Sequence, residues 1–315
     1  MVEVKFILIM LQIKDFIRDV LALPQKTEKK FYGKIFGKNY WEKTHLKYNP
    51  EAPYSTTSCL CNSKLFDMPF FIYWMNRLKE DIIYYRKQWE FVYVCQTLFE
   101  HEMLKKGKRG LVFGCGKEPL VALFASMGCK IMATDLDIND NNAGAWVNTD
   151  QHIKDNYLEL NASGICDKEI FKQNVTFMDV DMNKIPSELR DYDFCWSCSS
   201  LEHIGSLENG LKFVKNSLET LRKGGLAIHI TEFNLTSNDK TLDTPGLSFY
   251  REKDIRRLIR ELEADGHKVY PLVLDRGNTV ADKFVDKPPY QSLSVHMKLR
   301  ISNYDITSVA LIIEK

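Results

Sequence analysis

Two glycines and a later aspartate have the types and the spacing of a nucleoside-binding site. Gly114 and Gly116 follow an apolar run, and Asp135 ends the next apolar run, nineteen residues after Gly116. Glycines let a backbone turn approach a ligand closely, and a carboxylate at the end of the second strand accepts hydrogen bonds from ribose hydroxyls. Aspartate is also a common turn or capping residue. We favour ribose binding because the glycine turn and the carboxylate occur together.

Pro119 indicates which nucleoside ligand fits. It stands where the dinucleotide fingerprint G-x-G-x-x-G has its third glycine. A dinucleotide places its pyrophosphate on free N–H groups at the start of the helix, and proline has no N–H although it suits the first helical turn. A ligand without phosphates loses little from this exchange. S-adenosylmethionine, which joins adenosine to an amino acid through a sulfonium, is such a ligand.

Further side chains for chemistry follow the later apolar runs. Asp181 ends the run before NKIP, where it can accept a hydrogen bond from the adenine amino group. His203 and Glu232 lie near the ends of the next two runs, and ligands of open α/β sheets bind outside the carboxyl ends of the strands. Because the pKa of histidine lies near neutrality, His203 is our preferred general base and Glu232 the next candidate. The alternative for His203 is a capping or packing role, and His229, inside a predicted strand, is expected to pack in the core.

The elements that position these residues alternate between strand and helix. This alternation predicts an α/β, Rossmann-like, doubly wound sheet of seven mostly parallel strands. Two C-terminal runs, 268–274 and 306–315, are expected to pair antiparallel at the sheet edge. The expected strands are 111–114, 130–137, 174–181, 192–199 and 226–233, and the expected helices are 119–128, 207–225 and 251–266.

The chain is expected to divide into a helical N-terminal extension, 1–106, and an α/β domain, 107–315. In the extension, a helix is predicted from Leu11, a loop over 49–63 and one long or kinked helix over 69–104. The extension and an insertion at about 275–304 are predicted to form a lid over the second substrate. Candidates to line that lid are Arg86, Trp89, Tyr290 and His296, with core packing favoured for Trp89.

The net charge of the chain limits the kinds of partner that it could bind. The net charge is +1, which gives no global field for DNA or an anionic membrane. The basic and aromatic segment 26–48 is the local exception: it is either a solvated surface or a patch that meets phosphate on a substrate. The N-terminal apolar run is too short to span a membrane and lacks the cleavage site of a signal peptide.

Eight cysteines scattered through apolar segments favour reduced thiols in a cytoplasmic protein. A structural zinc at Cys59 and Cys61, or at Cys195 and Cys198, is the weaker alternative, and we assign no metal.

Residues 108–234 resemble class I S-adenosylmethionine-dependent methyltransferases. The resemblance lies in LVFGCG with ATDLD, in DVDMNKIP, in YDFCWSCSSLEHIGSL and in the turn LRKGGLAIHITEF. RKQWEF, GKEPLVALF and DRGNTVADKFVDKPPY resemble a bacterial subgroup with a helical N-terminal extension. The cofactor-binding residues that motifs and resemblance together imply are Gly114, Cys115, Gly116, Glu118, Asp135, Leu136, Asp181, Met182 and Ser199.

One position departs from the family pattern. Many members carry an acid two residues before the first glycine, where it helps to bind the methionine amino group, and this chain has Val112. We hypothesise that Glu118 supplies the missing carboxylate.

The leading function is methyl transfer from S-adenosylmethionine to a small polar acceptor, such as a hydroxyl of a carbohydrate or of a cell-surface glycan precursor. An RNA methyltransferase is the alternative within the same class, disfavoured by the near-neutral charge and the lack of an RNA-binding module. A nicotinamide-dependent oxidoreductase, disfavoured by Pro119, and a non-catalytic binding protein are the alternatives from other classes. Whether oxygen or nitrogen is methylated and which oligomer forms stay open.

Overall fold

The computed structural model describes residues 50–51, 56–140, 143–144, 147, 151–153, 156–290 and 295–315. The helix predicted from Leu11 and the basic segment 26–48 lie outside these ranges. Within them, no helix is both long enough and apolar enough to cross a membrane.

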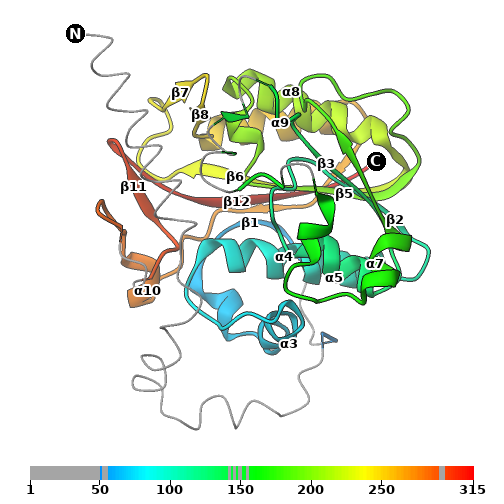
Figure 1. Cartoon of the computed structure of the whole chain (residues 1–315). Helices are drawn as coiled ribbons and strands as arrows, with labels where there is room; N and C mark the ends of the chain where they lie inside the picture. The colour runs from blue at the N-terminus through cyan, green and yellow to red at the C-terminus, as the bar shows by residue number, and fades with distance from the viewer. Residues whose placement is uncertain are drawn as a thin grey trace, which may run out of the picture.

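A single mixed sheet forms the centre of the molecule (Figure 1). Five strands run parallel in the order β4-β3-β2-β5-β6, which is the 3-2-1-4-5 order of a Rossmann-type sheet. The predicted doubly wound α/β fold is therefore confirmed. The parallel strands are β2 (Arg109–Val112), β3 (Lys130–Asp135), β4 (Val175–Asp179), β5 (Tyr192–Cys198) and β6 (Leu221–Asn234).

The predicted antiparallel C-terminal pair is present, but it does not end the sheet. β12 (Tyr304–Glu314) pairs antiparallel with β6 from Ile306↔Asn234 to Glu314↔Leu226, and β9 (Lys268–Val269) pairs antiparallel with β12. Beyond β12 lie β1 (Ser58–Leu60) and β10 (Leu272–Val273). With β11 (Leu299–Ile301), the described residues contribute ten strands to this sheet instead of the predicted seven.

The prediction of a loop over 49–63 was wrong, because this stretch contains β1. Three residues are too few to show the alternation by which a strand is recognised. Pairing with β12 makes this stretch a strand: Cys59 and Leu60 pair with Ala310 and Val309.

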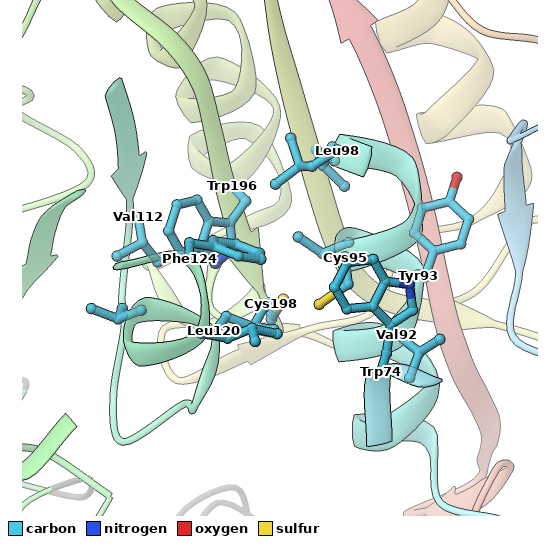
Figure 2. Close-up of a cluster of buried hydrophobic side chains, with 14 of the residues drawn as sticks. Trp74, Val92, Tyr93, Cys95, Leu98, Val112, Leu120, Phe124, Trp196 and Cys198 are labelled. Carbon is cyan, nitrogen blue, oxygen red and sulfur yellow. The ribbon is translucent and has the colours of Figure 1, made fainter. Parts of the chain in front are cut away.

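Helices cover both faces of the sheet, as Figure 1 shows. Neighbouring β2 residues face opposite sides: Val112 belongs to the core under α3, α4, α5 and α7, and Leu111 belongs to the core under α8 and α9. In Figure 2, Trp196, Phe124 and Val112 lie on the first side, together with side chains of α3 and α4. These helices are α3 (Pro69–Leu78), α4 (Arg86–Glu100), α5 (Leu120–Ser126), α7 (Lys168–Asn174), α8 (Leu207–Ser217) and α9 (Glu252–Ala264).

The helix predicted over 69–104 is two helices. Lys79 adopts a left-handed conformation, with φ of 60°, and its N–H bonds back to the end of α3. The Gln88 side chain then accepts from the N–H of Ile83 and donates to the carbonyl of Asp81. No glycine or proline in the sequence marks this break, which a side chain of the following helix stabilises.

The described part of 275–304 pairs with β12 through β11 and contacts the start of η2 (Ser63–Asp67). The Asp282 carboxylate accepts from the N–H and the hydroxyl of Ser63, so the segment is joined to the start of the chain's described part. The remaining short elements are η3 (Tyr157–Asn161), η4 (Leu201–His203), η5 (Leu218–Thr220), β7 (Asp243–Thr244), β8 (Leu247–Ser248) and α10 (Val280–Lys283).

Candidate active site

The glycine turn after β2 is tightly packed. Gly114 and Gly116 have φ of +62° and +48°, the left-handed region that favours glycine. A Cβ at Gly114 would lie 2.7 Å from the Cβ of Ser200, and one at Gly116 would lie 3.1 Å from the carbonyl oxygen of Gln151. Backbone geometry and lack of space therefore both require glycine at position 114.

Asp135 is joined directly to this turn. Its Oδ2 accepts from the N–H of Gly116 at 2.8 Å, and its Oδ1 accepts from the N–H of Leu136 at 2.9 Å. Burial raises the pKa of Asp135, although the side chain stays partly exposed at the end of β3. Each oxygen retains a second lone pair, so the carboxylate can also accept hydrogen bonds from a ligand.

The other proposed cofactor contacts lie around the same turn. Met182 is buried, and its sulfur would lie 3.6 Å from a Cβ at Gly114. Cys115 is buried with its sulfur 4.0 Å from Asp135 Oδ2. Asp181 does not end a strand as predicted, because β4 stops at Asp179; it lies in the following turn and accepts from the N–H of Asn183 at 2.8 Å.

Glu118 is buried rather than open to solvent in the loop. Its Oε1 accepts from the indole Nε1 of Trp196 at 2.5 Å, and it is 8% exposed. Burial raises the pKa of Glu118 to about 8, opposed by the Trp196 hydrogen bond. Trp196 is the register partner of Val112 on β2. The carboxyl group thus lies on the same side of the sheet as the side chain at position 112.

Ser199 points toward α4. With φ of 50°, its hydroxyl donates to the Glu90 carboxylate at 3.0 Å. The neighbouring Ser200 is the serine that touches the glycine turn. Residue type alone does not distinguish Ser200 from the adjacent Ser199. Gln151 contributes its backbone carbonyl, which any residue type could supply.

A buried ionic cluster lies at the N-terminal end of α4. The Arg86 guanidinium contacts Glu232 Oε1 at 2.5 Å and Glu90 Oε1 at 3.3 Å. Lys87 Nζ lies 3.0 Å from Glu90 Oε2, and Ser308 of β12 donates to Glu90 at 2.6 Å. Burial raises the pKa of Glu232, opposed by the charge of Arg86. Glu232 is therefore part of an ion pair whose two partners are both about 2% exposed.

His203 lies in η4, after β5. Its Nδ1 donates to the carbonyl of Gly246 at 2.8 Å, which leaves the lone pair on Nε2, 3.8 Å from Glu202 Oε1. Burial lowers the pKa of His203 to about 4, so the ring is neutral at pH 7. Burial, with the Glu232 charge, raises the pKa of Glu202 to about 8.

Of the remaining predicted residues, His229 and Trp89 pack in the core, whereas His296 lies near Arg86. His229 has both ring nitrogens 2.8 Å from serine hydroxyls, those of Ser197 and Ser217, as expected for a core residue. Trp89 is buried and stacks on Tyr93. His296 lies beside Tyr85 and Tyr290 at the same end of the molecule as Arg86.

Within the described ranges, no group of three or more His, Cys, Asp or Glu residues is arranged to hold a metal ion. All eight cysteines are free thiols.

No family model and no curated protein sequence matches this chain. Among solved structures, the methyltransferase domain of bacterial CtHen1 is 12% identical with a TM-score of 0.45, over 73% of this chain and 100% of that chain. A putative sarcosine dimethylglycine methyltransferase from Galdieria sulphuraria is 14% identical with a TM-score of 0.44, over 78% and 97%. A SAM dependent methyltransferase from Aquifex aeolicus is 18% identical with a TM-score of 0.37, over 69% and 88%. At these identities and TM-scores, the similarity to solved structures does not establish the fold or the function. The fold assignment rests on the strand order.

Proposed function

We propose that this protein is an S-adenosylmethionine-dependent methyltransferase that acts on a hydroxyl of a small polar acceptor, a carbohydrate or a cell-surface glycan precursor. The observation that carries the proposal is the 2.8 Å hydrogen bond from the N–H of Gly116, in the glycine turn, to the Asp135 carboxylate. Only glycine fits at position 114, and the carboxylate stands at the end of the neighbouring parallel strand. The helix that follows begins after Pro119, which offers no N–H to a pyrophosphate.

The residues present fit the cofactor's chemical groups. Asp135 would accept from the ribose hydroxyls, and Asp181 with Met182 would bind the adenine. Glu118 would bind the methionine ammonium, since it lies on the same face of the sheet as the missing acid at Val112. Further contacts in this proposal come from Cys115 and Leu136, with Ser200 in place of Ser199, whose hydroxyl bonds to Glu90.

When bound, S-adenosylmethionine supplies a methyl group on a sulfonium that needs no further activation. The chain's own residues then align the acceptor and hold its proton. The His203 tautomer, with its proton on Nδ1, leaves Nε2 able to accept a proton. Glu232 is the second candidate: burial raises its pKa, and the charge of Arg86 opposes that rise.

Titration calorimetry with S-adenosylhomocysteine and with NAD tests the cofactor. We expect saturable binding of S-adenosylhomocysteine and none of NAD. Binding of NAD alone would assign the site to an oxidoreductase.

A screen of metabolite extracts with isotope-labelled methyl donor tests the acceptor. We expect label in a polar, hydroxyl-bearing product. With that acceptor in hand, turnover by His203→Ala tests His203. Loss of turnover with intact cofactor binding would support His203 as the base, and near-full turnover would remove His203 from the mechanism.

We further propose the division into 1–106 and 107–315, with the described parts of 275–304 on the acceptor side. The contacts of Arg86 with Glu232 and of Ser63 with Asp282 support a lid role for the first region, since they hold it against the end of β6 and against the segment 275–304.

A further inference from the structure

Three buried side-chain atoms without a hydrogen-bond partner belong to a residue that follows β5, a residue near the end of β6 and a residue whose backbone bonds to Tyr84 and Arg86. They are Glu202 Oε1, Glu232 Oε2 and His296 Nε2. A buried polar atom without a partner costs free energy, so such atoms are rare in native proteins. Their occurrence around the proposed acceptor side indicates polar groups of a ligand that would complete these bonds.

His296 has the geometry of an oriented base. Its Nδ1 lies 2.6 Å from Asp286 Oδ2, and because a carboxylate accepts, Nδ1 carries the proton and Nε2 the lone pair. His296 is 8% exposed and Asp286 3%. The ring is also held between Tyr85 and Tyr290, with centroids 5.5 and 5.8 Å away. A carboxylate that fixes the tautomer of a histidine and stabilises its protonated form is a recurring device for general bases.

Contacts connect this pair with the proposed reaction side. The carbonyl of His296 accepts from the N–H of Arg86, whose guanidinium contacts Glu232 at the end of β6. Tyr85, which packs on the His296 ring, belongs to the same apolar cluster as Leu247. Leu247 follows Gly246, the residue that binds His203. His296 and His203 therefore lie on the same end of the sheet.

The chemistry of the three atoms selects a class of ligand. With Nδ1 as the donor to Asp286, His296 Nε2 can only accept, so the ligand must donate a hydrogen bond to it. Glu232 can accept as a carboxylate, and Glu202, which is protonated at neutral pH, can both accept and donate. A phosphate or carboxylate would face Glu202 and Glu232. An ammonium would face Arg86 and Lys87, which lie in the same cluster. A neutral hydroxyl avoids both conflicts.

We propose that His296, held by Asp286, binds a hydroxyl of a neutral polyhydroxylated acceptor and takes up its proton during methyl transfer. This rests on the proposed function and assigns to His296 the proton uptake for which His203 is the other candidate. The hydroxyl oxygen bonds to the methyl carbon as the carbon–sulfur bond breaks and its electron pair stays on sulfur. The hydroxyl proton passes to Nε2, and Asp286 stabilises the imidazolium until the proton leaves to solvent. Glu202 and Glu232 form hydrogen bonds with further hydroxyls.

Saturation-transfer NMR on the full chain loaded with S-adenosylhomocysteine tests this. The probes are the methyl glycosides of glucose, galactose, mannose and fucose. We expect binding of at least one glycoside by the wild type and a loss of about fivefold or more in His296→Gln and Asp286→Asn. His101→Gln, at the other end of α4, is the matched control and is expected to bind as the wild type does. All variants should retain their melting temperature within a few degrees and their affinity for S-adenosylhomocysteine.

A second readout reports on the ring itself. In long-range proton–nitrogen spectra, the Nε2 signal of His296 is expected to shift when the glycoside is added. The Nε2 signal of His229, which already has a partner, should not move. A merely structural role for His296 predicts no shift.

The outcomes separate the two proposals. Failure of the wild type to bind S-adenosylhomocysteine contradicts the proposed function. If that ligand binds, the inference on His296 is overturned by undiminished glycoside binding in His296→Gln, by an unmoved Nε2 signal, or by binding of phosphorylated or amino sugars alone.

Discussion

Among single residues, Glu118 has an environment that would make cofactor binding depend on pH if Glu118 binds the cofactor as proposed. Its raised pKa, about 8, means that the carboxyl group is protonated at pH 6 to 7 without a ligand. An ammonium beside it would stabilise the carboxylate, so binding would release the proton. We therefore expect affinity for S-adenosylhomocysteine to rise by up to about tenfold per pH unit below the pKa.

Calorimetry in two buffers of different ionisation enthalpy measures this proton release. Glu118→Gln keeps an acceptor for Trp196 but cannot ionise, so binding should weaken and lose its pH dependence. Unchanged affinity and unchanged proton release in the variant would show that Glu118 does not meet the cofactor.

Gly114 can be tested against a control glycine, Gly224, whose substitution by alanine causes similar backbone strain. Gly114→Ala and Gly224→Ala both place a side chain at positive φ, +62° and +74°, and should each cost about 1–2 kcal/mol of stability. Only at Gly114 would the new Cβ meet another atom, Ser200 Cβ at 2.7 Å, whereas at Gly224 nothing lies within 4 Å. We expect Gly114→Ala to lose S-adenosylhomocysteine binding and Gly224→Ala to retain it in calorimetry. Equal binding by both would separate the turn from the cofactor site.

At the scale of elements, α4 joins the N-terminal region to the sheet through charges that are fully buried. Arg86→Met would leave Glu232 and Glu90 without their guanidinium partner, which costs about 3–5 kcal/mol for a buried pair. The double variant Arg86→Met with Glu232→Gln should recover part of this loss, since it removes one of the uncompensated charges.

Urea unfolding measures both. Arg257→Met is the control: it breaks an ion pair with Glu208 whose side chains are 39% and 71% exposed, and it should cost less than about 1 kcal/mol. A cost for Arg86→Met no larger than that of the control would mean that the cluster does not hold α4 in place.

At the scale of the whole molecule, the last strand lies in the interior of the sheet. β12 pairs with β6 on one edge and with β1 and β9 on the other, and residues 306–313 are all buried. Chain ends usually fray, but the amides of a strand that is paired on both edges exchange only when the sheet opens. We expect hydrogen exchange of the peptide 306–313 to be as slow as that of β5. Fast exchange there, with β5 protected, would contradict the observed pairing.

Local signals in the sequence were enough to predict the parallel sheet, and they also selected the central residues of the proposed cofactor site. Apolar runs, the glycines at 114 and 116, and Asp135 at the end of the next run are all readable within about thirty residues of chain. The hydrogen bond between Gly116 and Asp135 agrees with that reading. Periodicity also predicted α9, whose buried residues Ile255, Leu258 and Leu262 share one face.

Only the tertiary structure decided the features that depend on contacts between residues far apart in the chain. β1 exists because β12 offers it an edge, and the break between α3 and α4 depends on a side chain of the second helix. Glu118 changed from a loop acid to a buried group through Trp196, 78 residues away. His296 became a base candidate only beside Asp286 and Arg86. Burial and the choice of hydrogen-bond partner set pKa values and tautomers, and both are properties of the folded chain that residue types alone do not contain.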